Sequence, residues 1–356
     1  MNTLNRRALM QLSLAAGASA APVARRKVIT EQDPRNIKLA HRVSIRVSDE
    51  DLLFLKQIGL DHFRAEIPAD APLEELGRAR DRFAKFGIRM ISCAHYAHRT
   101  PDIELGLPGP KRERDLDKCR AVVRELGKLG VGILVLDWHP GNTYTTAIVE
   151  RRGYRVREFN LAEYRAKMDD LTFGREYSVD EIWAALEYFL RSVLPVAEEV
   201  GVKLAMHPDD PPIPKMHGVP RIFSNAEGYR RAEKLAHGSK NWGVRLCVGT
   251  WSEGGKAMGS DVFEMIREWG PKGKIFDVDL RNVTSTLPVF QETFPDDGFV
   301  DLYQVVKALR QAGYSGPMVP DHVPELAGDG GDRRAATAYC IASMRAMLRR
   351  ANEEAG

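Results

Sequence analysis

Residues 178–212 read SVDEIWAALEYFLRSVLPVAEEVGVKLAMHPDDPP, and they contain one helix followed by one strand. Ser178 and Glu181 have the spacing of a capping box at the start of a helix, and Gly201 supplies a left-handed stop at its end. The apolar run that follows predicts a strand over 202–207, and this strand ends in His207, Pro208 and two aspartates. This stretch is therefore a helix–strand unit with polar residues at the end of the strand.

Units of this kind recur along the chain. Strands are predicted at 37–47, 62–67, 89–95, 131–137, 202–207, 242–248, 274–280 and 317–320. Helices are predicted from Ser48 to Gly59 and at 72–86, 112–129, 178–201, 226–237, 261–269, 299–312 and 333–353. Alternation of strands and helices implies a parallel sheet, and eight units favour closure into an α/β, (β/α)8 TIM barrel. We expect one domain over 33–354. The Gly-rich fingerprint of a dinucleotide-binding sheet does not follow the first strand.

One connection is longer than the others. Residues 139–177, which begin with His139, exceed the usual length of a loop between a strand and a helix. We interpret this insertion as a candidate lid over the barrel, with a mobile surface insertion as the alternative.

Composition excludes several classes of protein. The chain has 356 residues, of which 44% are hydrophobic, and a formal net charge of only +3, which indicates a folded globular protein. No basic stripe with interleaved aromatic residues is present, so we expect no nucleic-acid partner. Cys93, Cys119, Cys247 and Cys340 form no C-x-x-C pair, and we expect buried thiols rather than a disulfide framework.

The first 24 residues have the pattern of an export signal. Arg6 and Arg7 precede a mildly apolar run that ends in Ala18-Ser19-Ala20, as in a twin-arginine signal peptide. We therefore expect a periplasmic protein. No later apolar run is long enough to span a membrane.

Polar residues of metal-binding types follow four of the predicted strands. In a barrel of this kind the active site lies at the C-terminal ends of the strands. There the sequence places His207, Cys247 with the glycine two positions later, Asp277, Asp279, Arg281 and Asn282, and Asp321 with His322. A site formed by His207, Cys247, Asp279 and Asp321 would surround one divalent cation with nitrogen, sulfur and oxygen ligands, leaving positions open for a chelating substrate.

Several spaced motifs resemble those of the mannonate dehydratases. They are the run 201–212, 218–222, Cys247-Val248-Gly249-Thr250, Leu280-Arg281-Asn282-Val283, Glu292-Thr293-Phe294, 298–301 and 316–322, and the resemblance covers about residues 181 to 325. It implies a Mn²⁺ or Fe²⁺ ion at the barrel mouth, held by His207, Cys247 and Asp321. Where the family has a histidine two residues before the Arg-Asn pair, this chain has Asp279. An extra carboxylate should favour a hard cation such as Mn²⁺.

The resemblance also implies an activity, namely dehydration of a sugar acid, with D-mannonate converted to 2-keto-3-deoxy-D-gluconate and water. We assign His322 to acid–base work, because an imidazole exchanges protons near neutral pH. The planar fork of Arg281 or Arg221 could clamp the substrate carboxylate. Asp209 and Asn282 are further candidates for contact with the substrate.

Two alternatives remain open from the sequence. Related barrels use a similar ion for sugar isomerisation or epimerisation, and fold alone does not separate these reactions from dehydration. The chain could also be an exported sugar-binding barrel without catalysis. The expected partner is a small sugar acid as substrate, and self-association into a homo-oligomer is left open.

Overall fold

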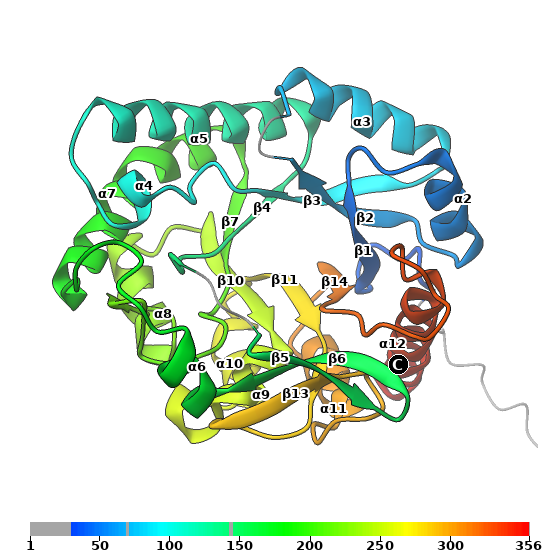
Figure 1. Cartoon of the computed structure of the whole chain (residues 1–356). Coiled ribbons are helices and arrows are strands. Elements are labelled where there is room, and N and C mark those ends of the chain that lie inside the picture. The colour runs from blue at the N-terminus through cyan, green and yellow to red at the C-terminus, as the bar shows by residue number, and fades with distance from the viewer. Residues whose placement is uncertain (1–29, 69–70, 142–144, 356) are drawn as a thin grey trace, which may run out of the picture.

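Eight parallel strands form a closed barrel in the computed structural model, which describes residues 30–68, 71–141 and 145–355 (Figure 1). These strands are β1 (Lys38–Ser44), β2 (His62–Ile67), β3 (Arg89–His95), β4 (Ile133–Leu136), β7 (Lys203–Met206), β10 (Trp242–Cys247), β11 (Ile275–Leu280) and β14 (Pro317–Pro320). Each strand pairs with the next one along the chain, and β14 closes the barrel on β1. The predicted (β/α)8 barrel is confirmed.

A helix follows each barrel strand and packs outside it. These helices are α2 (Asp49–Gln57), α3 (Glu74–Lys85), α5 (Pro110–Leu129), α7 (Val179–Val200), α8 (Ala226–Leu235), α10 (Val262–Trp269), α11 (Leu302–Gln311) and α12 (Arg334–Ala355). The predicted capping box of α7 is present, because Glu181 N donates to Ser178 Oγ over 3.2 Å and Ser178 N donates to the Glu181 carboxylate over 2.8 Å. Gly201 ends α7 with a φ of 72°, a conformation that favours glycine. Shorter helical segments are α4 (Pro101–Glu104), α6 (Leu161–Lys167) and α9 (Val248–Gly254).

The apolar core lies between the strands and the helices. A cluster of large aromatic side chains fills the space where α8 and α10 pack on β10, formed by Tyr229, Trp242 and Trp269 with ring centroids 5.9–6.4 Å apart. By contrast, charged side chains such as Arg64 and Asp279 are fully buried inside the barrel. The helices therefore stabilise the barrel from outside, while polar groups occupy its centre.

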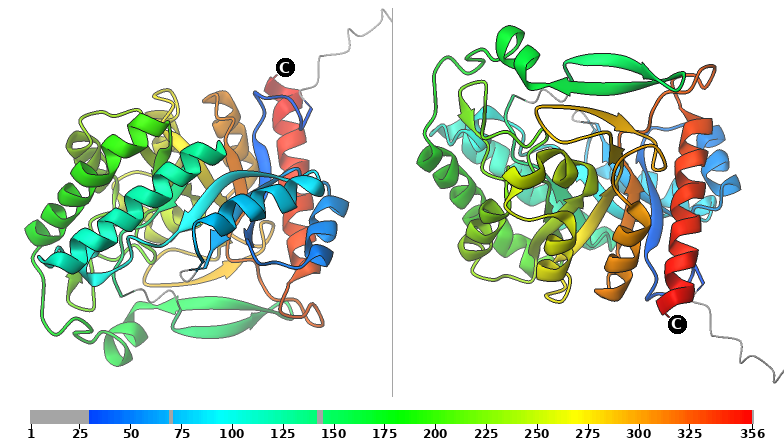
Figure 2. Two further views of the ribbon diagram at one scale, coloured as in Figure 1. Left: turned by 90° about the horizontal axis from the view of Figure 1, so that it is seen from above. Right: turned by 90° about the horizontal axis from the view of Figure 1, so that it is seen from below.

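A second sheet lies at the C-terminal end of the barrel, and we call it the cap sheet. It consists of β12 (Asn282–Val283), β13 (Val289–Thr293), β6 (Tyr154–Asn160) and β5 (Ala147–Arg151), in that order and antiparallel. Because β12 directly follows β11, the sheet lies beside the ends of the barrel strands. Figure 2 shows the β5–β6 hairpin and α6 set apart at one end of the barrel. The predicted insertion 139–177 thus forms a hairpin and a helix, which the sequence did not predict.

The structure also bears on the predictions about the cysteines, membrane-spanning segments and the export signal. All four cysteines are buried and free, as predicted. Within the described ranges, no helix has the length and apolar character needed to cross a bilayer. The predicted export signal over 1–24 lies outside the described residues. Two short antiparallel strands, β8 (Lys215–Met216) and β9 (Val219–Pro220), follow the end of β7 and form a hairpin.

Candidate metal centre and active site

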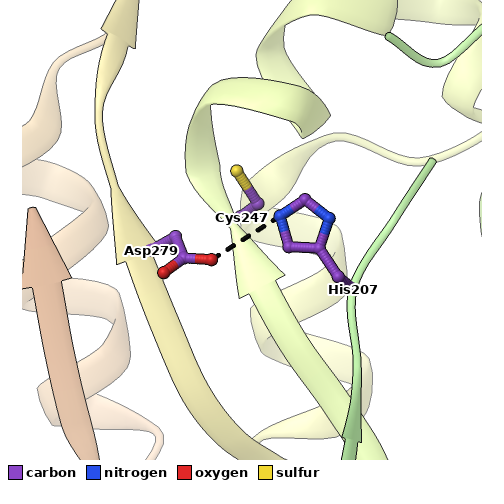
Figure 3. A group of neighbouring side chains, drawn as sticks. All are labelled: His207, Cys247 and Asp279. Carbon is purple, nitrogen blue, oxygen red and sulfur yellow. Dashed lines mark ion pairs between the residues drawn. The ribbon is translucent and has the colours of Figure 1, made fainter. Parts of the chain in front are cut away.

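Three of the predicted metal ligands meet at the centre of the barrel. His207 follows β7, Cys247 ends β10 and Asp279 lies in β11, and one ligand atom from each lies within 4.8 Å of the others. Figure 3 shows the His207 ring facing the Asp279 carboxylate, with 3.5 Å between Nε2 and Oδ2. Cys247 and Asp279 are at the same level because they are register partners in neighbouring parallel strands. The fourth predicted ligand, Asp321, follows β14 and places Oδ2 3.9 Å from Cys247 Sγ.

The His207 imidazole is held in the form that binds metals. Its Nδ1 lies 2.6 Å from the carbonyl oxygen of Pro208, so the hydrogen bond assigns the proton to Nδ1 and leaves the Nε2 lone pair toward Asp279. Burial lowers the pKa of His207 to about 4. The ring is therefore neutral at physiological pH, as coordination requires.

The Cys247 thiol is shielded from water and held by a neighbouring hydroxyl. Thr250 Oγ1 donates to Sγ over 3.1 Å. Burial raises the pKa of Cys247 well above its usual range. A thiol in these surroundings becomes a thiolate when a cation is bound, so the sulfur suits coordination better than free nucleophilic attack.

Two buried arginines, which sequence reasoning missed, flank Asp279. Arg64 Nη1 lies 2.7 Å from Oδ1, and Arg245 Nε lies 2.6 Å from Oδ2. Arg64 also pairs with Asp277. Burial acts to raise the pKa of Asp279, but Arg245 and Arg64 outweigh it, and the pKa is lowered. Asp279 is therefore ionised, and its negative charge is shared with two guanidinium groups.

Arg281 is enclosed by carboxylates from three other segments. It donates to Asp321 Oδ2 over 3.1 Å and to Asp210 Oδ2 over 2.8 Å, and it also pairs with Glu253. Gly249 lies directly against it, since a β-carbon there would be 2.5 Å from Arg281 Cγ. These bonds use Arg281 to orient Asp321, and the predicted contact of Arg281 with a substrate carboxylate stays a prediction.

The predicted substrate-binding residues Arg221, Asp209 and Asn282 also bond within the protein. Arg221 Nη1 donates to Asp209 Oδ1 over 3.3 Å, and both side chains are fully buried. Burial raises the pKa of Asp209 to about 7. The Asn282 amide donates to the carbonyl oxygens of residues 295 and 300 and accepts from the amides of 283 and 300. In this structure the polar groups of these three residues are bonded to other parts of the chain, and their contact with a substrate stays a prediction.

His322 lies beside the donor cluster with a carboxylate behind it. Its Nδ1 is 2.6 Å from Glu292 Oε1 in the cap sheet, and its Nε2 is 3.8 Å from Asp321 Oδ2. The backbone of His322 has a φ of 44°, an uncommon conformation for a non-glycine residue that is often seen at functional sites. Sequence reasoning placed Glu292 only within a motif and assigned it no role. The pair has the geometry of an acid–base group oriented by a carboxylate.

A further polar cluster lies at the ends of β3 and β4. Arg99 Nε donates to Asp137 Oδ1 over 2.6 Å, and His98 Nε2 lies 2.9 Å from the Asp137 carbonyl oxygen. The His139 ring centroid is 6.2 Å from that of His207, so this cluster adjoins the donor group. In the sequence, His98 and Arg99 follow one predicted strand, and Asp137 and His139 lie at the end of another. Sequence reasoning assigned no role at the site to this cluster.

The donor atoms of the cluster suit a divalent cation. Three buried guanidinium groups, those of Arg64, Arg245 and Arg281, pair with six buried carboxyl groups, those of Asp210, Glu253, Asp277, Asp279, Glu292 and Asp321. Burial holds the pKa of Glu253 well above its usual range and raises the pKa of Asp277, so these six groups do not all carry a negative charge. Nitrogen, sulfur and oxygen donors together suit a transition metal, so His207, Cys247 and Asp279, with Asp321 beside them, fit a metal site.

Several known proteins are similar to this chain in sequence or in structure. The family model described as D-mannonate dehydratase (UxuA) matches residues 156–349. Mannonate dehydratase 2 of Halalkalibacterium halodurans is 30% identical over 65% of this chain and 72% of its own length, and the mannonate dehydratase of Thermotoga petrophila is 32% identical over 70% and 77%. The crystal structure of mannonate dehydratase from Streptococcus suis serotype 2 superposes with a TM-score of 0.80 at 25% identity, over 90% of this chain and 96% of that one. A structure of L-ribulose 3-epimerase matches with a TM-score of 0.57 at 15% identity, over 90% and 97%, and shows the fold alone.

The family model covers more than half of the chain, and the matched part contains all four strand ends that carry the donor residues. The epimerase likeness extends only to the barrel. The chain belongs to the D-mannonate dehydratase family.

Proposed function

We propose that this chain dehydrates a sugar acid with the help of a divalent metal ion, and that D-mannonate, giving 2-keto-3-deoxy-D-gluconate and water, is its substrate. The observation that supports the proposal is the placing of the His322–Glu292 pair next to the donor cluster of His207, Cys247 and Asp279. A proton-transfer group and a metal site thus lie side by side at the barrel mouth. Membership of the family supports the same reaction.

Dehydration removes the proton at C2 of the sugar acid and breaks the bond between C3 and its hydroxyl oxygen. The hydroxyl takes up a proton and leaves as water, and the remaining enol becomes the 2-keto-3-deoxy acid. A divalent cation would hold the carboxylate and the neighbouring hydroxyl and lower the barrier to loss of the C2 proton. The C2 proton passes to a base, and the departing hydroxyl takes a proton from an acid.

His322 is the residue that we assign to protonation of the departing hydroxyl. Because Glu292 accepts the Nδ1 hydrogen, Nε2 is the atom that can exchange a proton, and it faces Asp321 at 3.8 Å. Arg281 donates to the same oxygen of Asp321 through a 3.1 Å hydrogen bond. Arg281 therefore orients the carboxylate that lies next to the proton-transfer atom.

We propose Mn²⁺ or Fe²⁺ as the metal. One imidazole, one thiolate and carboxylate oxygens suit either ion. The carboxylate of Asp279 in place of an imidazole favours the harder ion, Mn²⁺, although Arg64 and Arg245 withdraw part of its charge.

The activity is tested by anaerobic incubation of the purified, Mn²⁺-loaded protein with D-mannonate. We expect formation of a 2-keto-3-deoxy acid, measured by mass spectrometry, and no formation after treatment with a chelator. Conversion of ketoses without conversion of any aldonate would replace the dehydratase with an isomerase or epimerase. Tight sugar binding without any product would indicate a non-catalytic barrel.

Replacement of His322 should impair chemistry and leave the metal in place. For His322→Gln we expect kcat to fall by about 10²–10⁴-fold, the usual contribution of a positioned acid or base. Glu292→Gln should lower kcat less, because the ring would keep a hydrogen-bond acceptor of lower charge. Metal content by mass spectrometry is the control, and a variant that loses both metal and activity would move His322 to the role of a ligand support.

The ligand role of Asp279 can be separated from its ion pairs. Asp279→Asn should lower both metal occupancy and stability, because it removes a donor and leaves Arg64 and Arg245 with less compensation. Asp277→Asn is the matched control, since Asp277 pairs with Arg64 but lies outside the donor cluster. Loss of one partner of a buried pair costs roughly 3–5 kcal/mol. Equal metal occupancy in the two variants would show that Asp279 is not a ligand.

We also propose that the chain is exported to the periplasm, on the support of Arg6 and Arg7 before an apolar run. Fractionation of cells should recover the protein in the periplasm, and exchange of both arginines for lysine should retain it in the cytoplasm. Equal distribution of the two forms would contradict this proposal.

A further inference from the structure

The carboxylate of a sugar acid has no arginine partner among the residues that sequence reasoning selected. Arg281 is bonded to Asp210, Asp321 and Glu253, and Arg221 is bonded to Asp209. Both guanidinium groups are buried. A carboxylate that enters the barrel mouth would therefore need a different cation, in addition to the metal.

The cap sheet presents such a cation on the face that carries Glu292. In the antiparallel pair of β13 and β6, Phe290 is opposite Phe159 and Gln291 is opposite Glu158. Side chains alternate between the two faces of a strand, and opposite residues share a face. Arg157 therefore shares the face of Phe159 and Phe290, and Glu292 lies on that same face of β13.

Arg157 also lines the same cavity as the acid–base pair. This cavity has a volume of about 40 Å³, and its walls include Arg157, Glu292 and His322. That space is sufficient for a small anionic group and insufficient for a whole sugar acid. The rest of a bound sugar acid would have to lie outside it, and His322, which lines the cavity and has Nε2 3.8 Å from Asp321 Oδ2, connects the cavity to the donor cluster.

The other two arginines around this cavity have partners, while Arg157 has none in the part of the chain that the structure describes. Arg155 Nη1 donates to Glu325 Oε1 over 3.0 Å, and Arg333 Nη1 donates to the carbonyl oxygen of Val323. Across the described ranges, no hydrogen bond or ion pair involves the Arg157 side chain, which is partly buried. A partly buried cation without a partner, next to an acid–base pair, is well placed to receive an anion.

We infer that Arg157 is a substrate-binding residue whose guanidinium group donates to the carboxylate of the sugar acid. The inference rests on the proposed function and deepens it. The planar fork of arginine matches the two oxygens of a carboxylate, and a ketose lacks this group. Arg157 would therefore select acids over neutral sugars, and it gives the 139–177 insertion a direct part in substrate recognition.

The test compares Arg157→Gln with a matched control, Arg151→Gln, which removes an arginine of the adjacent strand β5 that is paired with Asp297 and lies outside the cavity. All variants carry His322→Gln, so that D-mannonate is bound and not converted, and calorimetry on the metal-loaded protein measures binding of D-mannonate and of the neutral alditol D-mannitol. We expect Arg157→Gln to weaken binding of D-mannonate by about 10–100-fold and to leave binding of D-mannitol unchanged. Arg151→Gln should bind both as the protein with His322→Gln alone does.

A change in KM that exceeds the change in kcat should accompany the loss of binding. Arg157→Lys keeps the positive charge but loses the planar guanidinium group, so its affinity for D-mannonate should lie between the affinities measured with Arg157 intact and with Arg157→Gln. It also provides a second variant if Arg157→Gln fails to fold. Unchanged binding of D-mannonate, or equal weakening of D-mannonate and D-mannitol, would overturn the inference.

The result also separates this inference from the proposed function. Binding of D-mannonate that depends on Arg157, without product from the unmodified protein, would remove the dehydratase proposal and leave the role of Arg157. If the unmodified protein forms product and Arg157→Gln keeps full activity, the dehydratase proposal stands and the inference about Arg157 is wrong. Absence of any binding of sugar acids would overturn both.

Discussion

The guanidinium group of Arg281 holds three carboxyl groups together at the centre of the barrel. Asp210 follows β7, Glu253 lies in the last turn of α9 and Asp321 follows β14, and each bonds to Arg281. A buried carboxylate that loses its partner costs several kcal/mol. These three segments cannot separate without that cost, so the position of Asp321 beside the donor cluster depends on this buried arginine.

A second group of buried ion pairs holds the Asp279 carboxylate of the donor cluster in place. Arg64 from β2 and Arg245 from β10 bind Asp279, and Arg64 also binds Asp277. These arginines hold the carboxylate that stands where the resemblance implies a histidine. A histidine side chain at this position would be neutral. The positive charges of the two guanidinium groups offset the negative charge of Asp279, so the surroundings of Asp279 are less negative than those of an isolated carboxylate. The substitution is thus compatible with a metal site because the surrounding barrel compensates for its charge.

Most of the barrel, and the meeting of His207, Cys247 and Asp279, could be predicted because their signals are local. Caps, glycine stops and apolar runs identify helices and strands within a few residues, and polar residues at strand ends meet in any barrel of this kind. The cap sheet could not be predicted, since β6 pairs with β13 more than 120 residues later and neither strand is a strong signal alone. Arg64 and Arg245 lie within strands, where the sequence does not reveal that they face the same carboxylate as Asp279.

The roles of the arginines could not be predicted from the sequence alone. Arg281 lies within a motif and Arg157 lies in an insertion, so the sequence favoured Arg281 as the partner of a substrate. What decides the role of an arginine is the number of carboxylates within reach of its guanidinium group, and these come from distant segments. Arg281 has three bonded to it, while no such contact to Arg157 exists among the described residues. An arginine whose hydrogen-bond donors are already used can only position other groups, whereas one at a cavity wall with its donors unused can bind a ligand.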